Sequence, residues 1–185
     1  MRTFFLMLCC MVAATTVHAA QTCKTDSIPA STPDSQLIDN GDGTVTDTKT
    51  GLMWKQCLEG LSGDCSGIAD TFTWQQALLQ PGTVNANGGF AGYTDWRLPN
   101  IQELNSLVEE QCYEPAINLT YFPNTPTYLS NTPTSYVWFV WSGSPDADNS
   151  DVTFHSAWNV NFTNGDSGAY NRTDSYAVRL VRNAR

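Results

Sequence analysis

The sequence contains little histidine and few basic residues. Its two histidines are His18 and His155, and nine Lys and Arg stand against 18 Asp and Glu, for a net charge of −9 at pH 7. This surplus of acid disfavours a nucleic-acid partner, because binding to phosphates requires clustered Lys and Arg. A single histidine outside the first twenty residues also disfavours a nucleophile activated by a neighbouring base. The composition predicts a protein that is not an enzyme and does not bind nucleic acid.

The sequence also lacks an apolar run long enough to cross a membrane. The run from Phe4 to Ala14 is shorter than the ~20 residues that a spanning helix needs. Arg2 precedes it and small residues follow it, which is the pattern of a secretory signal peptide at residues 1–20. We therefore expect export to the periplasm or the cell surface, without a membrane span. Loss of Arg2 changes the net charge from −9 to −10, which disfavours general attraction to anionic lipids or sulfated polysaccharides but leaves room for a local basic pocket.

Cysteine is absent after Cys112, and four cysteines remain outside the leader. An even number in an oxidising compartment predicts two disulfides. Cys57 and Cys65 enclose a short loop rich in Gly and Ser, so we pair them, which leaves Cys23 with Cys112. Four cysteines allow three pairings, and the sequence alone does not choose among them. The spacing required for a zinc site is missing.

The composition changes near residue 38. Residues 21–38 are polar and rich in Ser, Thr and Pro, which predicts an extended N-terminal arm pinned to the body by Cys23. Residues 39–185 are long enough to form one domain with its own core.

Two helices are predicted in the middle of this domain. Thr73 is suited to cap the first, and Pro81 and Gly82 are expected to end it. Asn100 and Glu103 have the spacing of a capping box at the start of the second. The apolar face of the second helix comprises Ile101, Leu104, Leu107 and Val108.

Strands are predicted at both ends of the domain. Residues 42–54 have the pattern of a hairpin with a turn at 48–51. Three later segments alternate as strands do: 135–143, 156–162 and 175–182. In the last of these, Arg179 and Arg182 are expected on opposite faces, one solvated and one paired inward. Arg97 is expected to bond backbone carbonyls, Asp95 or Glu103. Strands flanking two helices predict an α+β fold.

Six segments together resemble one known family. They are DGTVTDTKTGLMW (42–54), TWQQAL (73–78), DWRLPNIQELNSLV (95–108), VWSGSP (140–145), AWNVNFTNG (157–165) and VRLVR (178–182). In content and order they are similar to the Lcl C-terminal domain family, named for a collagen-like adhesin. The resemblance implies a C-type-lectin-like α+β domain with two helices, paired terminal antiparallel strands and a long loop region. It also implies a secreted or surface adhesion module with glycans as the favoured ligands.

The same resemblance includes a distant likeness to the formylglycine-generating enzymes. Their catalytic cysteine pair has no counterpart here, because no cysteine follows Cys112. The resemblance therefore implies no catalytic site. A hydrolase would need paired carboxylates in one cleft, and the spacing of Asp and Glu identifies no such pair.

Calcium binding is not predicted. The segments EPA (114–116) and WNV (158–160) stand where calcium-dependent C-type lectins have E-P-N and W-N-D, so part of the ligand set is missing. The acidic cluster of Asp146, Asp148 and Asp151 is a weak alternative calcium site, for which a solvated turn is the preferred interpretation. No cofactor is expected.

The chain is rich in aromatic residues, with six Trp and seven Tyr. Trp54, Trp74 and Trp158 lie in periodic apolar segments and are assigned to the core. Tyrosines in polar loops beside Asn are suited to stack on sugar rings and bond hydroxyls. The predicted ligand-binding residues are Tyr113, Tyr121, Tyr128, Asn131, Tyr170 and Asn171.

These residues place the contact surface in a loop region from 113 to 151 and in a turn at 165–174. The predicted function is a non-catalytic adhesion module that recognises a glycan or another cell-surface ligand. The alternative is a protein-interaction or oligomeric envelope component without glycan binding. The oligomeric state does not follow from the sequence.

Overall fold

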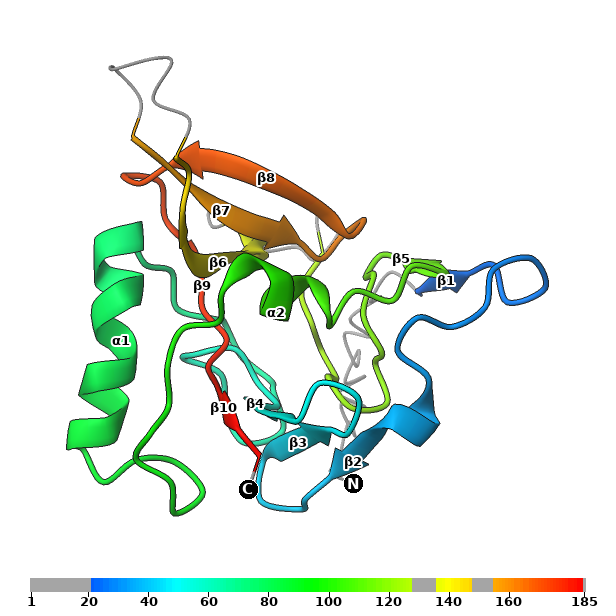
Figure 1. Cartoon of the computed structure of the whole chain (residues 1–185), viewed down its shortest axis with the longest axis horizontal. Coiled ribbons are helices and arrows are strands. Elements are labelled where there is room, and N and C mark those ends of the chain that lie inside the picture. Colours follow the sequence, from blue (N-terminus) through cyan, green and yellow to red (C-terminus); the bar gives the residue numbers. More distant parts are fainter. Residues whose placement is uncertain (1–20, 128–135, 148–154, 185) are drawn as a thin grey trace, which may run out of the picture.

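The computed structural model describes residues 21–127, 136–147 and 155–184, and it has the predicted α+β architecture (Figure 1). Two four-stranded sheets and two helices form the body. Neither helix in the described part of the chain is long and apolar enough to cross a membrane. The predicted signal peptide lies outside the described residues.

The lower sheet in Figure 1 has the strand order β10-β4-β3-β2. Its strands are β2 (Leu37–Asp39), β3 (Thr44–Asp47), β4 (Leu52–Lys55) and β10 (Val181–Asn183). Strands β3 and β4 form the predicted hairpin, with Val45 opposite Trp54. The buried Asp47 carboxylate accepts hydrogen bonds from the amide groups of Lys49 (2.9 Å) and Thr50 (3.3 Å) in the turn. The turn is thus stabilised by a side chain that the sequence supplies locally.

The upper sheet has the strand order β8-β7-β6-β9. Its strands are β6 (Tyr136–Pro145), β7 (Ser156–Asn161), β8 (Asp166–Asn171) and β9 (Tyr176–Ala177). The prediction of a turn over 165–174 is wrong, since most of this segment is strand β8. It pairs along its full length with β7, from Ser156 opposite Asn171 to Asn161 opposite Asp166. As a mostly exposed edge strand it has no alternating apolar residues, which is why the pattern did not reveal it.

The predicted strand 175–182 is in fact two short strands in different sheets. Strand β9 pairs parallel to β6, and β10 pairs antiparallel to β4. The chain between them carries Arg179 through the core, and the expectation that one of Arg179 and Arg182 is solvated is wrong because both are buried. Arg179 donates to the carbonyls of Lys55 (3.1 Å) and Gln56, and its burial lowers the pKa of the guanidinium to about 9.

Helix α1 (Trp74–Ala86) begins at Thr73 as predicted but runs past Pro81 and Gly82. Pro81 is buried, and the helix continues past it although its ring removes one backbone donor. The helix ends at Asn87, where Gly88 adopts a left-handed φ of 91° and the amide of Gly89 donates to the carbonyl of Val84 (3.0 Å). This is a Schellman motif, which glycine accommodates without steric cost.

Helix α2 (Ile101–Asn105) is shorter than its apolar pattern indicated. The capping box of Asn100 and Glu103 forms as predicted. Beyond Asn105 the amide groups bond three residues back, as in a tighter turn, and Val108 pairs with Ile117 in an isolated bridge. Tertiary contacts therefore end the helix early, although Leu104 and Leu107 still point into the core.

Both disulfides have the pairing that we preferred, Cys23 with Cys112 and Cys57 with Cys65. The first joins the short strands β1 (Thr22–Cys23) and β5 (Cys112–Tyr113), which pair antiparallel. The arm also contains a 3₁₀ turn at Asp34–Gln36. The arm is attached more extensively than predicted, because Thr32 within it is buried.

The upper sheet has apolar side chains on both faces. Val140 and Val160 pack into one cluster with Leu104 of α2, and Trp141 and Ala157 pack into a second cluster with α1 residues. The amide of Trp74 at the start of α1 also donates to the carbonyl of Arg172 (3.0 Å), so α1 begins directly beside the end of β8.

Candidate functional site

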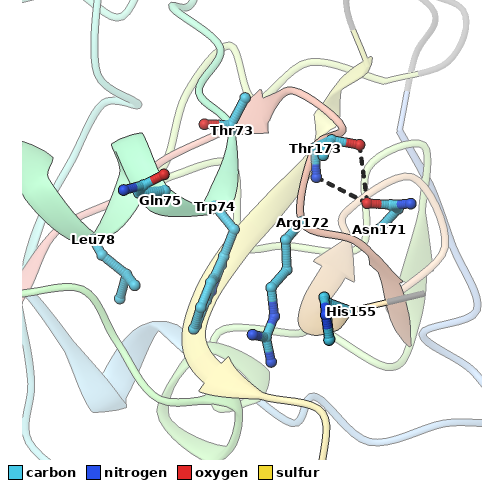
Figure 2. A pocket seen from close by; sticks show the side chains of 8 residues that line it. All are labelled: Thr73, Trp74, Gln75, Leu78, His155, Asn171, Arg172 and Thr173. Atoms are coloured by element: carbon cyan, nitrogen blue, oxygen red, sulfur yellow. Dashed lines mark hydrogen bonds between the residues drawn. The ribbon is translucent and has the colours of Figure 1, made fainter. Parts of the chain in front are cut away.

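A hollow opens between the first turn of α1 and the adjacent ends of β7 and β8 (Figure 2). Its volume is about 610 Å³. We call it the α1–β8 hollow. Its lining comprises Thr73, Trp74, Gln75, Leu78, His155, Asn171, Arg172 and Thr173.

The helical wall of this hollow is built by the capping box that the sequence predicted. The side chain of Thr73 accepts a hydrogen bond from the amide of Gln76 (3.4 Å), and the side-chain oxygen of Gln76 accepts one from the amide of Thr73 (2.9 Å). The indole of Trp74 donates to the carbonyl of Ser142 in β6 (2.9 Å). These bonds hold the first turn of α1 against the upper sheet, so the wall is preorganised.

Arg172 forms the opposite wall. Its amide donates to the carbonyl of His155 (3.0 Å), which continues the pairing of β7 and β8 beyond Asn171. Its Nε donates to the carbonyl of Ser156 (2.9 Å), and its guanidinium carbon lies 4.5 Å from the ring centroid of Trp74. Figure 2 shows the two side chains lying side by side. Within the described part of the chain, no acceptor bonds Nη1 or Nη2 of Arg172.

Asn171 and Thr173 form the rim. The side-chain oxygen of Asn171 accepts hydrogen bonds from the amide of Thr173 (3.0 Å) and from its hydroxyl (2.9 Å), drawn as dashed lines in Figure 2. The side-chain nitrogen of Asn171 has no acceptor among the described residues. The amide group is therefore oriented by its oxygen, and its two N–H donors stay available.

Tyr170 precedes Asn171 in β8 and is 40% exposed, but it is not one of the residues that line the hollow. Its ring lies against Phe139 (centroids 5.2 Å apart) and Tyr176 (5.8 Å). It also covers Gly168, where an added Cβ would lie 2.5 Å from a Tyr170 ring carbon. These contacts hold the ring in place as a partly exposed aromatic surface on the strand that carries Asn171.

The other predicted ligand-binding residues lie elsewhere. Tyr113 is in β5 beside the N-terminal arm and is 42% exposed. The hydroxyl of Tyr121 donates to the carbonyl of Asp34 (3.1 Å), so it helps to hold the arm. Tyr128 and Asn131 lie outside the described residues. Of the described residues that were predicted to bind ligand, Asn171 alone lines the hollow. Tyr170 precedes it in β8, and Tyr113 lies in β5, away from the end of β8 that carries Asn171 (Figure 1).

Sequence reasoning missed Trp74 and Arg172 as parts of a site. Trp54 is fully buried as predicted, whereas Trp74 and Trp158 are only half-buried. One signal for Trp74 was available, because a residue that directly follows a helix N-cap lies at a helix end, where one side is open to solvent. Arg172 gave no signal, since its position depends on the unrecognised strand β8.

One of the three acidic residues considered for calcium lies in the described part of the chain. Asp146 follows β6, where its amide donates to the carbonyl of Ser156 (3.1 Å), while Asp148 and Asp151 lie outside the described residues. Among the residues that are described, no group of three or more His, Cys, Asp or Glu gathers in a way that would hold a metal ion.

A family model of the Lcl C-terminal domain matches residues 43–182. The match includes α1, both walls of the hollow and all four strands of the upper sheet. A search of curated proteins finds no match to the chain.

Proposed function

This chain belongs to the Lcl C-terminal domain family, an adhesin-related family, and we propose that it is an exported, non-catalytic binding module that recognises a glycan at the α1–β8 hollow. The observation that carries the proposal is the composition of that hollow. Trp74 and Leu78 supply apolar surface, while Asn171 and Arg172 supply donors without acceptors among the described residues. Sugars have apolar C–H faces and a rim of hydroxyls, so they need this mixture.

The rigidity of the walls supports the same function. Trp74 is held by the carbonyl of Ser142, Arg172 by that of Ser156, and Asn171 by Thr173. Groups that are already oriented lose little conformational entropy when a ligand binds. Tyr170, one residue before Asn171 in β8, adds a partly exposed ring on which a second sugar unit can stack.

Export to the periplasm or cell surface is part of the proposal. The predicted signal peptide at residues 1–20 and the two disulfides support it, since disulfides persist in oxidising compartments. Detection of the cleaved protein in the periplasm or at the surface of the producing cell would test this part. Retention of an uncleaved chain in the cytoplasm would contradict it.

The glycan proposal is tested with a glycan array on the oxidised mature protein, run with calcium and again with a chelator. The variant Tyr170→Ala should weaken binding about fivefold, because one stacked aromatic ring contributes roughly 1 kcal/mol. Tyr113→Ala is the matched control, since it removes a ring of nearly equal exposure at a distant site. Equal loss in both variants would contradict the location, and loss of binding in the chelator would point to a metal-dependent site instead.

A protein partner is the second candidate, favoured by one observation on the outer surface of α1. Leu78 is 42% and Leu79 is 65% exposed, and Leu78 also lines the hollow. Contiguous apolar surface marks sites of protein contact, and these two leucines are the exposed apolar side chains of α1 that could begin such a contact. Absence of glycan binding on the array, together with a stable protein complex in light scattering, would favour this candidate. Leu79→Ser should then dissociate that complex.

A further inference from the structure

We propose that the sugar recognised at the α1–β8 hollow carries a carboxylate, as in a uronic or sialic acid, and that Arg172 binds it. This inference rests on the proposed function and adds the chemical class of the ligand. It begins from the charge of the protein. A chain with eighteen acidic and eight basic residues after loss of Arg2 repels anions in general. An unpaired guanidinium that lines a pocket is therefore exceptional in this molecule.

Comparison of the four arginines in the described part of the chain shows how exceptional it is. Arg97 pairs in two hydrogen bonds of 2.7 Å with Glu103, and Arg182 pairs with Asp95 (2.7 Å). Arg179 is buried and bonds backbone carbonyls. Arg172 is the one of these four that combines two features: it has no carboxylate partner, and it lines a hollow. Arg172 therefore forms no ion pair with the described residues.

The orientation of Arg172 is suited to a planar anion. Its Nε donates to the carbonyl of Ser156 and its guanidinium carbon lies over the Trp74 ring, so the group is held by two contacts. The edge that carries Nη1 and Nη2 remains without an acceptor among the described residues. Two parallel donors at a fixed spacing match the two oxygens of a carboxylate.

The surroundings favour a sugar acid over a simple small anion. The N–H donors of the Asn171 side chain lie on the rim of the same hollow as Arg172, and Thr73, Gln75 and His155 line it further. A volume of about 610 Å³ accommodates more than a carboxylate group alone. A heavily sulfated chain is disfavoured because one cation cannot offset many charges against an acidic surface.

The test uses an array of uronic and sialic acid glycans, their methyl esters, neutral glycans and sulfated glycans. The oxidised mature protein should bind the free acids at least tenfold more tightly than the esters. Arg172→Gln should weaken binding of the acids by ~10- to 100-fold, as expected for loss of hydrogen bonds to a charged group. Lys49→Gln removes the same charge from the exposed β3–β4 turn and should leave binding unchanged.

Each other outcome overturns the inference in a recognisable way. If acids and esters bind equally, the glycan function stands and the carboxylate inference fails. The natural protein alone is enough for this comparison. If sulfated glycans bind as well as acids and Lys49→Gln weakens both, general charge attraction explains the binding. If no glycan of any kind binds, the proposed function fails together with the inference.

Discussion

Replacing Glu109 with Gln should release the N-terminal arm and destabilise the protein. The Glu109 side chain is 3% exposed and accepts five hydrogen bonds. Four come from the arm: from the amide (3.0 Å) and hydroxyl (3.3 Å) of Ser31 and from the amide (2.9 Å) and hydroxyl (2.8 Å) of Thr32. The fifth comes from the amide of Gln111 (3.2 Å). A single carboxylate thus satisfies most of the donors where the arm meets the body.

The size of the effect follows from these contacts. In Glu109→Gln, the new NH₂ group faces the amide of Thr32, so a buried donor loses its acceptor at a cost of about 1–3 kcal/mol. The remaining bonds lose their charge assistance, for a total loss near 3 kcal/mol. With an m-value of roughly 2 kcal/mol/M, the urea midpoint should fall by about 1.5 M. Glu110→Gln is the matched control, because Glu110 is exposed and should change stability by no more than about 0.5 kcal/mol.

The effect should also depend on pH. Burial raises the pKa of the Glu109 carboxyl, but the hydrogen bonds from Ser31 and Thr32 together outweigh burial and hold the pKa below its ordinary value. The ionised group therefore stabilises the fold above the unfolded-state pKa of about 4.3, and this stabilisation is lost as the pH falls through the folded pKa. The difference between natural protein and Glu109→Gln should be constant near neutral pH and shrink below about pH 4. An equal difference at pH 7 and pH 3, or a loss no larger than that of Glu110→Gln, would refute the reasoning.

Two further predictions concern stability. Gly82→Ala should raise the free energy of unfolding by about 0.5–1 kcal/mol, because Gly82 lies exposed inside α1 with open space around its Cα; a lower urea midpoint would contradict this. Replacing Cys23 and Cys112 by Ser should cost about 2 kcal/mol more than replacing Cys57 and Cys65, since the first disulfide closes a loop of 89 residues and the second one of 8. Parallel urea titrations check both, and an equal loss for the two disulfides would show that chain entropy does not govern their contributions.

Much of the fold was predictable because the signals were local. The capping boxes at Thr73 and Asn100 each depend on two side chains three residues apart, and both form. The hairpin of β3 and β4 likewise depends on adjacent alternation and turn residues. The pairing of Cys57 with Cys65 follows the shortness of the loop between them.

The errors arose where distant contacts override a local pattern. Burial of Pro81 lets α1 continue to the Schellman motif at Gly88, and the bridge from Val108 to Ile117 ends α2 early. Strand β8 exists because β7 provides a pairing partner, and its own residues show no alternation. The passage of Arg179 through the core depends on a change of sheet between β9 and β10.

The sequence by itself determined the α+β fold class and the positions where the two helices begin. It also indicated the preferred disulfide pairing and the resemblance to an adhesin-related family. Only the tertiary structure decided which polar and aromatic residues share a site. Trp74 and Arg172 are separated by almost 100 positions in the sequence, and they meet because β8 pairs with β7 while α1 packs on β6. Local spacing carries no information about such a contact, because backbone pairing between distant strands determines it.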